Sequence, residues 1–239
     1  MDRAELQEAL RQAGITDFVY ALPGIREATP GLESYFFVSP RSGGFVFGAF
    51  ERGVERIGYR SWAEDDVCRR CYQELVFEAK VRPPLNAAEE EAAKQRTEAL
   101  VKDVSTTARG AMAQLKASSM PYPLREGVIV DQFGQESGTY LYPDGTPMRQ
   151  RSLPPSVLNT TDPKFPFNYH RYEVARPFRV RAGMVAPAFE QPGGGVQFKA
   201  EPTLLPEAPP LLSILWLLRN GYLSRVAADS ADPDRAPLN

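Results

Sequence analysis

Histidine and cysteine, which often serve metal binding and nucleophilic chemistry, are scarce in this sequence. Its 239 residues include one histidine, His170, and two cysteines, Cys68 and Cys71. A structural zinc site would need two further Cys or His ligands beside the cysteine pair, so we expect no bound metal. Cys68, Cys71 and Leu75 follow the spacing of a buried helix face, which favours a core role. A redox-active pair is the alternative.

The sequence also lacks an excess of either charge and a long apolar run. Its 28 Lys and Arg residues nearly balance 30 Asp and Glu residues, for a net charge of −2. No basic patch stands out, which argues against nucleic acid and anionic membranes as partners. No apolar run reaches bilayer length, and residues 1–14 lack the core of a signal peptide. We therefore expect a soluble chain, cytoplasmic as synthesised, unless a specialised secretion system exports it.

Proline, in contrast, is abundant, with 22 residues. Many lie in the second half, where they argue against long helices and separate short strand candidates. Only one apolar stretch before Asn220 looks helical there, and it should pack on the sheet. In the first half, the patterns predict helices at 2–13, 61–80 and 86–118, and strands at 18–22, 34–39 and 44–50.

These elements predict an α+β fold with short antiparallel sheets in its second half. The expected parts are a small α+β domain at 1–82, a connecting helix at 86–118, a mainly β domain at 122–226 and a disordered tail at 227–239. The long helix could instead form the first layer of the second domain.

The most informative motifs lie between Asp131 and Gln197, with one more near Leu223. In order, the chain reads DQFG, TYLYPDG, RSLPP, YHRY, QPGGGVQF and NGYL. Each motif is weak alone, but their order and spacing resemble the catalytic domain of the tuberculosis necrotizing toxin family, which are NAD glycohydrolases. The resemblance covers about residues 127–223. The first half of the chain carries no comparable resemblance.

The resemblance implies a set of catalytic residues. NAD glycohydrolysis requires a held diphosphate, positioned rings and stabilisation of an oxocarbenium-like ribose. By position in the motifs, the implied catalytic residues are Tyr140, Arg151, His170 and Gln197. Their ordinary alternatives are a strand aromatic, a surface arginine, a structural histidine and a loop amide. The resemblance further implies a cleft near these four residues, where two sheets meet.

The implied substrate contacts are Gln132, Phe133, Gln191, Gly193 and Gly194. Gln132 departs from the family, which has an arginine in this motif. A neutral amide cannot pair with a phosphate as a guanidinium does. Nearby arginines that could substitute are Arg125, Arg149 and Arg176. Without the resemblance, DQFG is a turn and the glycine run is a loop.

Two functions follow as expectations. The first is an NAD(P) glycohydrolase of toxin type, with NAD as substrate, no cofactor and an immunity protein as partner. The second, motivated by Gln132, is a catalytically weak NAD- or nucleotide-binding module with an interaction or regulatory role. Residues 1–120 could serve as an adaptor for delivery or for a partner. Transfer of ADP-ribose to a protein is a minor alternative, since no glutamate pattern of such transferases is evident.

Overall fold

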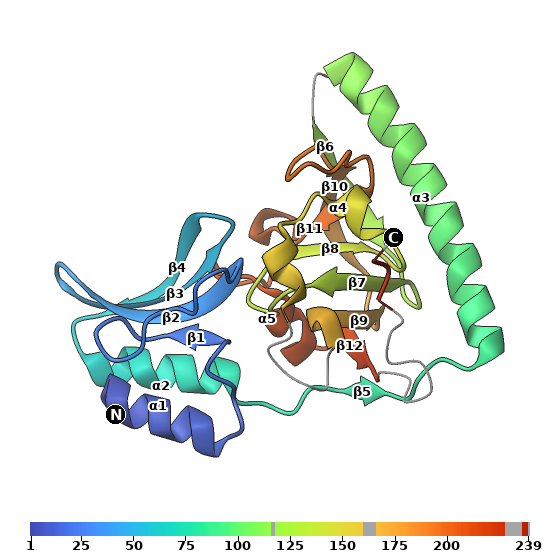
Figure 1. The fold of residues 1–239 in the computed structure, drawn as a ribbon. Coiled ribbons are helices and arrows are strands. Elements are labelled where there is room, and N and C mark those ends of the chain that lie inside the picture. Colours follow the sequence, from blue (N-terminus) through green and yellow to red (C-terminus); the bar gives the residue numbers. More distant parts are fainter. Residues whose placement is uncertain (116–117, 160–165, 228–235, 239) are drawn as a thin grey trace.

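The computed structural model describes residues 1–115, 118–159, 166–227 and 236–238, and it contains two separate sheets (Figure 1). The first has four strands in the order β1-β2-β3-β4, and the second has eight in the order β5-β12-β9-β7-β8-β11-β10-β6. Helices accompany both sheets. The predicted α+β class is confirmed.

The first sheet is formed by β1 (Tyr20–Ala21), β2 (Ser34–Arg41), β3 (Gly44–Glu51) and β4 (Val54–Ser61). Helices α1 (Arg3–Gln12) and α2 (Glu64–Leu75) lie together beside it (Figure 1). Strand β4 was not predicted, because its apolar and charged residues do not alternate and none of its residues is buried. The helix predicted at 61–80 spans Glu64–Leu75 instead, and the Ser61 hydroxyl, in front of it, donates to Asp66.

Cys68 and Cys71 confirm the core interpretation of the CxxC motif. Both thiols are free and fully buried, and they pack with Leu6, Leu10 and Leu75 between the helices and the sheet. Burial raises the pKa of Cys68 to about 12. A thiol of that kind is poorly reactive at neutral pH, which argues against the redox alternative.

The second sheet and its helices follow in chain order: β5 (Val81–Arg82), α3 (Ala87–Leu115), β6 (Ser119–Leu124), β7 (Ile129–Phe133), β8 (Tyr140–Pro143), α4 (Met148–Arg151), β9 (Tyr169–Val174), β10 (Phe178–Met184), β11 (Val196–Lys199), α5 (Ile214–Arg219) and β12 (Leu223–Val226). Short 3-10 turns occur at Pro155–Leu158, Pro166–Asn168 and Pro202–Leu204. All strand pairs in this sheet are antiparallel except β5 with β12.

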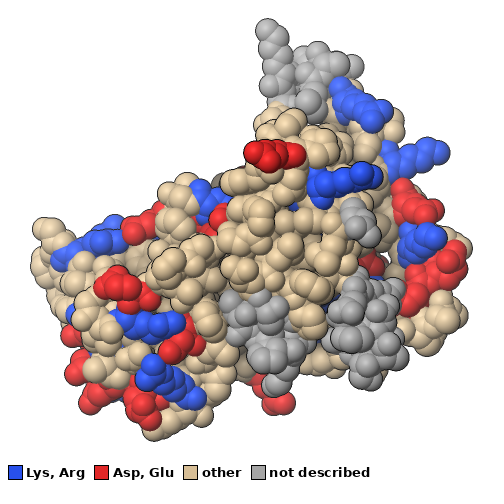
Figure 2. Space-filling model, viewed as in Figure 1, with Lys and Arg blue, Asp and Glu red and all other residues tan. Residues whose placement is uncertain are grey.

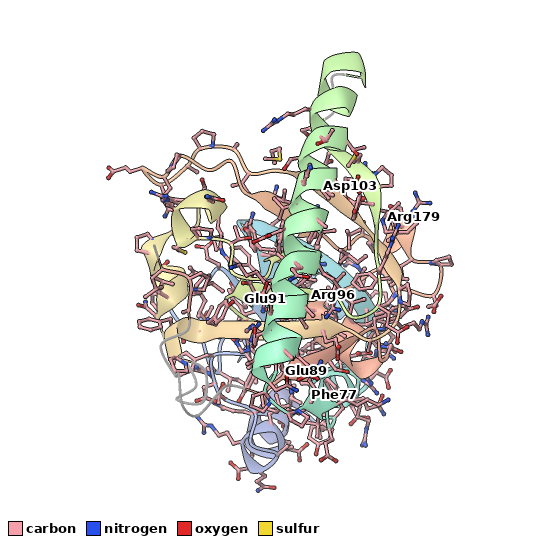
Figure 3. All side chains as sticks on the ribbon, turned by 90° about the vertical axis from the view of Figure 1, so that its right-hand side faces the viewer. Phe77, Glu89, Glu91, Arg96, Asp103 and Arg179 are labelled. Carbon is pink, nitrogen blue, oxygen red and sulfur yellow. The ribbon has the colours of Figure 1, made fainter. Side chains whose placement is uncertain are left out.

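Helix α3 begins with the predicted cap, in which Asn86 and Glu89 exchange side-chain and backbone hydrogen bonds. It runs along the second sheet, with Glu89 near its start and Asp103 further along (Figure 3). Leu100 and Val104 on α3 are buried in the main core of the second sheet. The structure therefore favours the first-layer alternative for this helix.

Helix α5 joins the two cores. Ile214, Leu217 and Leu218 pack in the core of the second sheet, whereas Leu211 and Leu215 pack in that of the first. The expectation that this apolar segment packs on the sheet is confirmed, and it contacts both halves of the chain. The domain boundaries themselves stay a prediction.

Other sequence expectations concern the tail, the membrane and the surface charge. The predicted disordered tail falls mostly outside the described residues, although the Pro237 carbonyl accepts a hydrogen bond from the Met148 amide. No helix in the described part of the chain has the length and apolarity that a membrane crossing needs. On the face shown in Figure 2, basic and acidic side chains are interspersed.

Candidate active site

The pairing of β7 with β9 fixes where the predicted residues point. These antiparallel strands place Gln132 opposite His170 and Phe133 opposite Tyr169. Because side chains alternate between the faces of a sheet, Gln132 and His170 share one face. Asp131 and Phe133 point to the other. The predicted residues are therefore divided between the two sides of the sheet.

A cavity of about 470 Å³ lies between the two halves of the chain. Its wall from the first half is mainly apolar, and its wall from the second is mainly polar. The first includes Ile15, Val19, Phe36, Leu75 and Phe77; the second includes Gln135, Glu136, Ser137, Asn168, His170 and Arg225. An apolar pocket of this size with a few convergent polar groups is typical of a small-molecule site.

Glu136 is the acidic group of this cavity. Its carboxylate accepts hydrogen bonds from the Tyr172 hydroxyl at 3.1 Å and from the Arg225 Nε at 2.8 Å, and it also contacts the second guanidinium nitrogen of Arg225. Burial would raise the pKa of Glu136, but the hydrogen bond and charge of Arg225 outweigh burial and lower it. Glu136 is therefore an anion at neutral pH.

His170 lies beside this network. Its side chain is 9% exposed and its ring stacks on Tyr172, with centroids 6.3 Å apart and planes inclined by 6°. The imidazole thus borders the cavity between a rigid aromatic neighbour and the negative charge of Glu136. This position suits a residue that orients a bound hydroxyl or water.

Arg151 does not lie where the resemblance implies. Its side chain is fully buried, as is that of Asp131, and the two form a bidentate pair at 2.6 and 2.8 Å. Nε donates to the Thr146 carbonyl at 2.7 Å, and the Tyr169 hydroxyl donates to Asp131 at 2.7 Å. Burial would lower the pKa of Arg151, but Asp131 outweighs it and raises the pKa. The guanidinium is committed to Asp131, so this geometry favours a structural role, and the catalytic role implied by the resemblance stays a prediction. The surface position that was the alternative is wrong, because the side chain is buried.

A second, smaller hollow contains three predicted residues, Gln132, Phe133 and Tyr140. Its volume is about 30 Å³, and it also includes Arg52 from the turn between β3 and β4. Gln132 is buried, and its Nε2 donates to the Gly134 carbonyl at 3.2 Å. Gln135 lines both this hollow and the large cavity, so the hollow and the cavity are neighbours.

The first sheet is fixed to the second beside this hollow. The Glu51 carboxylate accepts hydrogen bonds from the Thr139 amide at 2.6 Å and from the Thr139 hydroxyl at 2.7 Å. Arg56 donates to the Leu212 carbonyl at 2.6 Å, and Ser34 donates to the Gln135 carbonyl at 3.3 Å. These contacts hold the β3–β4 turn over β8.

The backbone amides of the glycine-rich loop before β11 donate hydrogen bonds to other parts of the protein. The Gly193 amide donates to the Arg149 carbonyl, and the Gly194 amide donates to the Val185 carbonyl. A Cβ on Gly193 would lie 2.7 Å from the Val185 oxygen, so close packing explains this glycine. Both amides donate within the protein, and the role of Gly193 and Gly194 as substrate contacts stays a prediction.

The other two predicted glutamines, Gln191 and Gln197, lie outside both cavities. Gln191 donates through Nε2 to the Leu153 carbonyl at 2.7 Å, which ties the loop to the segment after Arg151. Gln197 is half-buried in β11, opposite Gly183 of β10. Tyr140 and Gln197 lie on the neighbouring strands β8 and β11 and share one face of the sheet, whereas His170 points to the other face. With Arg151 buried as well, these four side chains do not line one shared cleft in this structure.

Sequence reasoning missed Glu136, Arg225 and Arg52. Glu136 comes directly after the DQFG motif and its following Gln, but its partner Arg225 is 89 positions away, so spacing gave no signal. Arg52 lies outside the region of resemblance. Its position in a two-residue turn was the available signal, since arginine is uncommon where a hairpin turns. Among the described residues, no three His, Cys, Asp or Glu side chains are grouped as a metal site would require.

Residues 123–226 match the family model described as tuberculosis necrotizing toxin. The match covers less than half of the chain. The matched region begins in β6 and ends with β12, so it contains all of the predicted site residues. It leaves out the first sheet and α3, and with them the apolar wall of the large cavity and Arg52.

A conidial surface nicotinamide adenine dinucleotide glycohydrolase of Aspergillus fumigatus is 44% identical to this chain over 106 residues. That match covers 44% of this chain and 41% of the fungal protein, so the similarity spans less than half of either. A solved structure of tuberculosis necrotizing toxin complexed with its immunity factor shares 24% identity. The structural alignment covers 46% of this chain and 56% of the toxin chain. Its TM-score of 0.33 is too low for the two site geometries to be compared.

Proposed function

We propose that this protein hydrolyses the nicotinamide–ribose bond of NAD to nicotinamide and ADP-ribose. The observation that carries the proposal is the 44% identity over 106 residues to a protein named as an NAD glycohydrolase, together with the match of residues 123–226 to the toxin-family model. The large cavity beside His170 supports it, because its volume and mixed lining suit one end of a dinucleotide.

The proposed chemistry assigns separate roles to the two walls of the cavity. When the glycosidic bond breaks, its electron pair leaves with the nicotinamide nitrogen, and the ribose carbon becomes oxocarbenium-like. Phe36 and Phe77 provide apolar surface for the departing ring, and the anionic Glu136 favours positive charge on the ribose. His170 orients a water that adds to the ribose carbon and releases its proton to solvent. No cofactor is required in this scheme.

Substitution of His170 tests this assignment. We expect His170→Ala to lower kcat at least about tenfold, because removing a positioned acid–base group typically costs a factor of 10² to 10⁴. A matched control is Asn220→Ala, an exposed residue beyond α5. If purified His170→Ala consumed NAD as fast as the parent, the site would lie elsewhere.

The second candidate is a module that binds NAD or a related nucleotide but turns it over poorly. It is favoured by two observations: Gln132 stands where the family has arginine, and Arg151 is committed to Asp131. Calorimetry with NAD separates the candidates. Micromolar binding without release of nicotinamide supports the module, whereas steady product formation supports the hydrolase.

Further aspects of function are also proposals. Action on NADP as well as NAD and a toxin role are consistent with the chemistry. An active enzyme would deplete the NAD of its producer, so an inhibitory partner or export from the producing cell would accompany it. The named fungal relative supports the chemistry and not a bacterial effector role.

A further inference from the structure

The turn between β3 and β4 places a cation directly at the hollow that contains Gln132. The guanidinium carbon of Arg52 lies 3.8 Å from the centroid of the Tyr140 ring, and its NH2 donates to the Tyr142 hydroxyl at 3.0 Å. The Arg52 side chain is exposed rather than buried, so it can be reached from solvent. Arg52 therefore differs from Arg151, whose guanidinium is paired with the buried Asp131.

The backbone at this turn is strained in a way that calls for an explanation. The turn has two residues, Arg52 and Gly53, with φ of +49° and +81°. Such hairpin turns favour Asn, Asp or Gly at both positions, and a side chain as large as arginine is disfavoured in this conformation. A residue held in a sparsely populated conformation is a reasonable candidate for function.

Two cations lie near the Tyr140 ring that lines the hollow. The Lys199 ammonium lies 5.8 Å from the same ring centroid, on the strand next to β8. Within the described part of the chain, Arg52 is the cation that lines the hollow. Glu33 and Glu51 are the acidic residues that line it, and the Glu51 carboxylate is already paired with Thr139 and Arg56.

The three arginines expected to replace the family's cation do not line this hollow. Arg125 and Arg149 are exposed at the end of β6 and on α4, and Arg176 pairs with Glu207. We propose that Arg52 is a substrate-binding residue, supplied by the first sheet, that pairs with the diphosphate of the substrate in place of the cation missing at Gln132. This inference rests on the proposed function for the identity of the substrate. The docking contacts of Glu51 and Arg56 are then what hold Arg52 in place.

The test uses the full chain and a substitution that suits the turn. Arg52→Asn removes the cation and introduces a residue that tolerates positive φ, so thermal unfolding should show a fold at least as stable as the parent's. We expect Arg52→Asn to weaken ADP-ribose binding in calorimetry about tenfold or more, because a charge-assisted hydrogen bond is lost. Arg52→Lys, which keeps the positive charge, should lose less affinity for ADP-ribose than Arg52→Asn. Arg41→Asn, in the same sheet but paired with Glu55, is the control and should bind as the parent does.

Binding and turnover are measured separately so that the two proposals fail differently. If the parent binds ADP-ribose and Arg52→Asn does not, the inference holds even when the parent leaves NAD intact. If the parent hydrolyses NAD, the KM should rise in Arg52→Asn with kcat changed by less than about threefold, as for a ground-state contact. Three results would overturn the inference about Arg52. They are equal ADP-ribose binding by parent and variant, no ADP-ribose binding by the parent, and faster NAD hydrolysis by the variant. The last result would mean that Arg52 covers Tyr140 and obstructs the site.

Discussion

Replacing Arg151 separates a structural role from the catalytic role that the motif implies. In Arg151→Met the apolar stem is kept and the guanidinium is lost. Asp131 would keep hydrogen bonds from the Tyr169 hydroxyl at 2.7 Å and the Gly145 amide at 2.9 Å, but its countercharge would be gone. Since both partners are fully buried, the carboxylate would remain without compensation in the protein interior.

The magnitude follows from the burial of this pair. Removing one partner of a buried ion pair typically destabilises a protein by about 3–5 kcal/mol. For a chain of this size, each kcal/mol shifts Tm by about 2–4 °C, so Arg151→Met should lower Tm by about 6–20 °C. Arg149→Met is the matched control, because Arg149 lies two positions earlier in α4 and is exposed. Its Tm should change by less than about 2 °C, as for most surface substitutions.

The assay is thermal unfolding followed by circular dichroism, with NAD hydrolysis measured on the same samples well below Tm. The double variant Arg151→Met with Asp131→Asn should recover part of the lost stability, because no buried charge is then left unpaired. If Arg151→Met kept the parent's Tm but lost NAD hydrolysis, the guanidinium would act on the substrate and the structural assignment would be wrong.

Three further predictions concern other parts of the molecule. Glu136 has a folded-state pKa below its ordinary value, so the stability it contributes is complete above that ordinary value and is lost as pH falls through the lowered pKa. In Glu136→Gln, the free energy of unfolding measured in urea should therefore fall less steeply than the parent's as pH drops from about 5 to 3, the range around the ordinary pKa of Glu. The same dependence of this free energy on pH in parent and variant would contradict the assigned pairing with Arg225. Cys68 and Cys71 should not react with a thiol reagent in the native state and should react fully in denaturant, and rapid native labelling would refute their core position. Gly194→Ala should cost about 1–2 kcal/mol from its positive φ alone, and Gly193→Ala should cost more because its Cβ also meets the Val185 carbonyl; equal costs in urea unfolding would argue against close packing at Gly193.

The sequence predicted the type of fold better than its assembly. Helix α3 was predictable within three residues because the Asn86–Glu89 capping pattern and its apolar stripe agree. Strand β4 was not predictable, since its apolar and charged residues follow no alternating pattern. The sharing of α5 between the two cores depends on which face each leucine meets, which no local pattern records.

The motifs located the candidate site along the chain but not in space. Asp131 offered a clue that was not used: an acidic residue inside a buried strand needs a cationic partner, and Arg151 is that partner. The pairing of Glu136 with Arg225, and the approach of Arg52 to Tyr140, join residues 85 or more positions apart. Such contacts follow from sheet order and domain docking, so motif spacing cannot predict them.

The most direct test of the central claim is a time course of NAD hydrolysis by the purified 239-residue chain, with NAD, nicotinamide and ADP-ribose separated by chromatography. We predict that NAD disappears and that the other two accumulate in equal amounts, one of each for every NAD consumed. If a demonstrably folded sample left NAD unchanged over several hours, the glycohydrolase proposal would be contradicted.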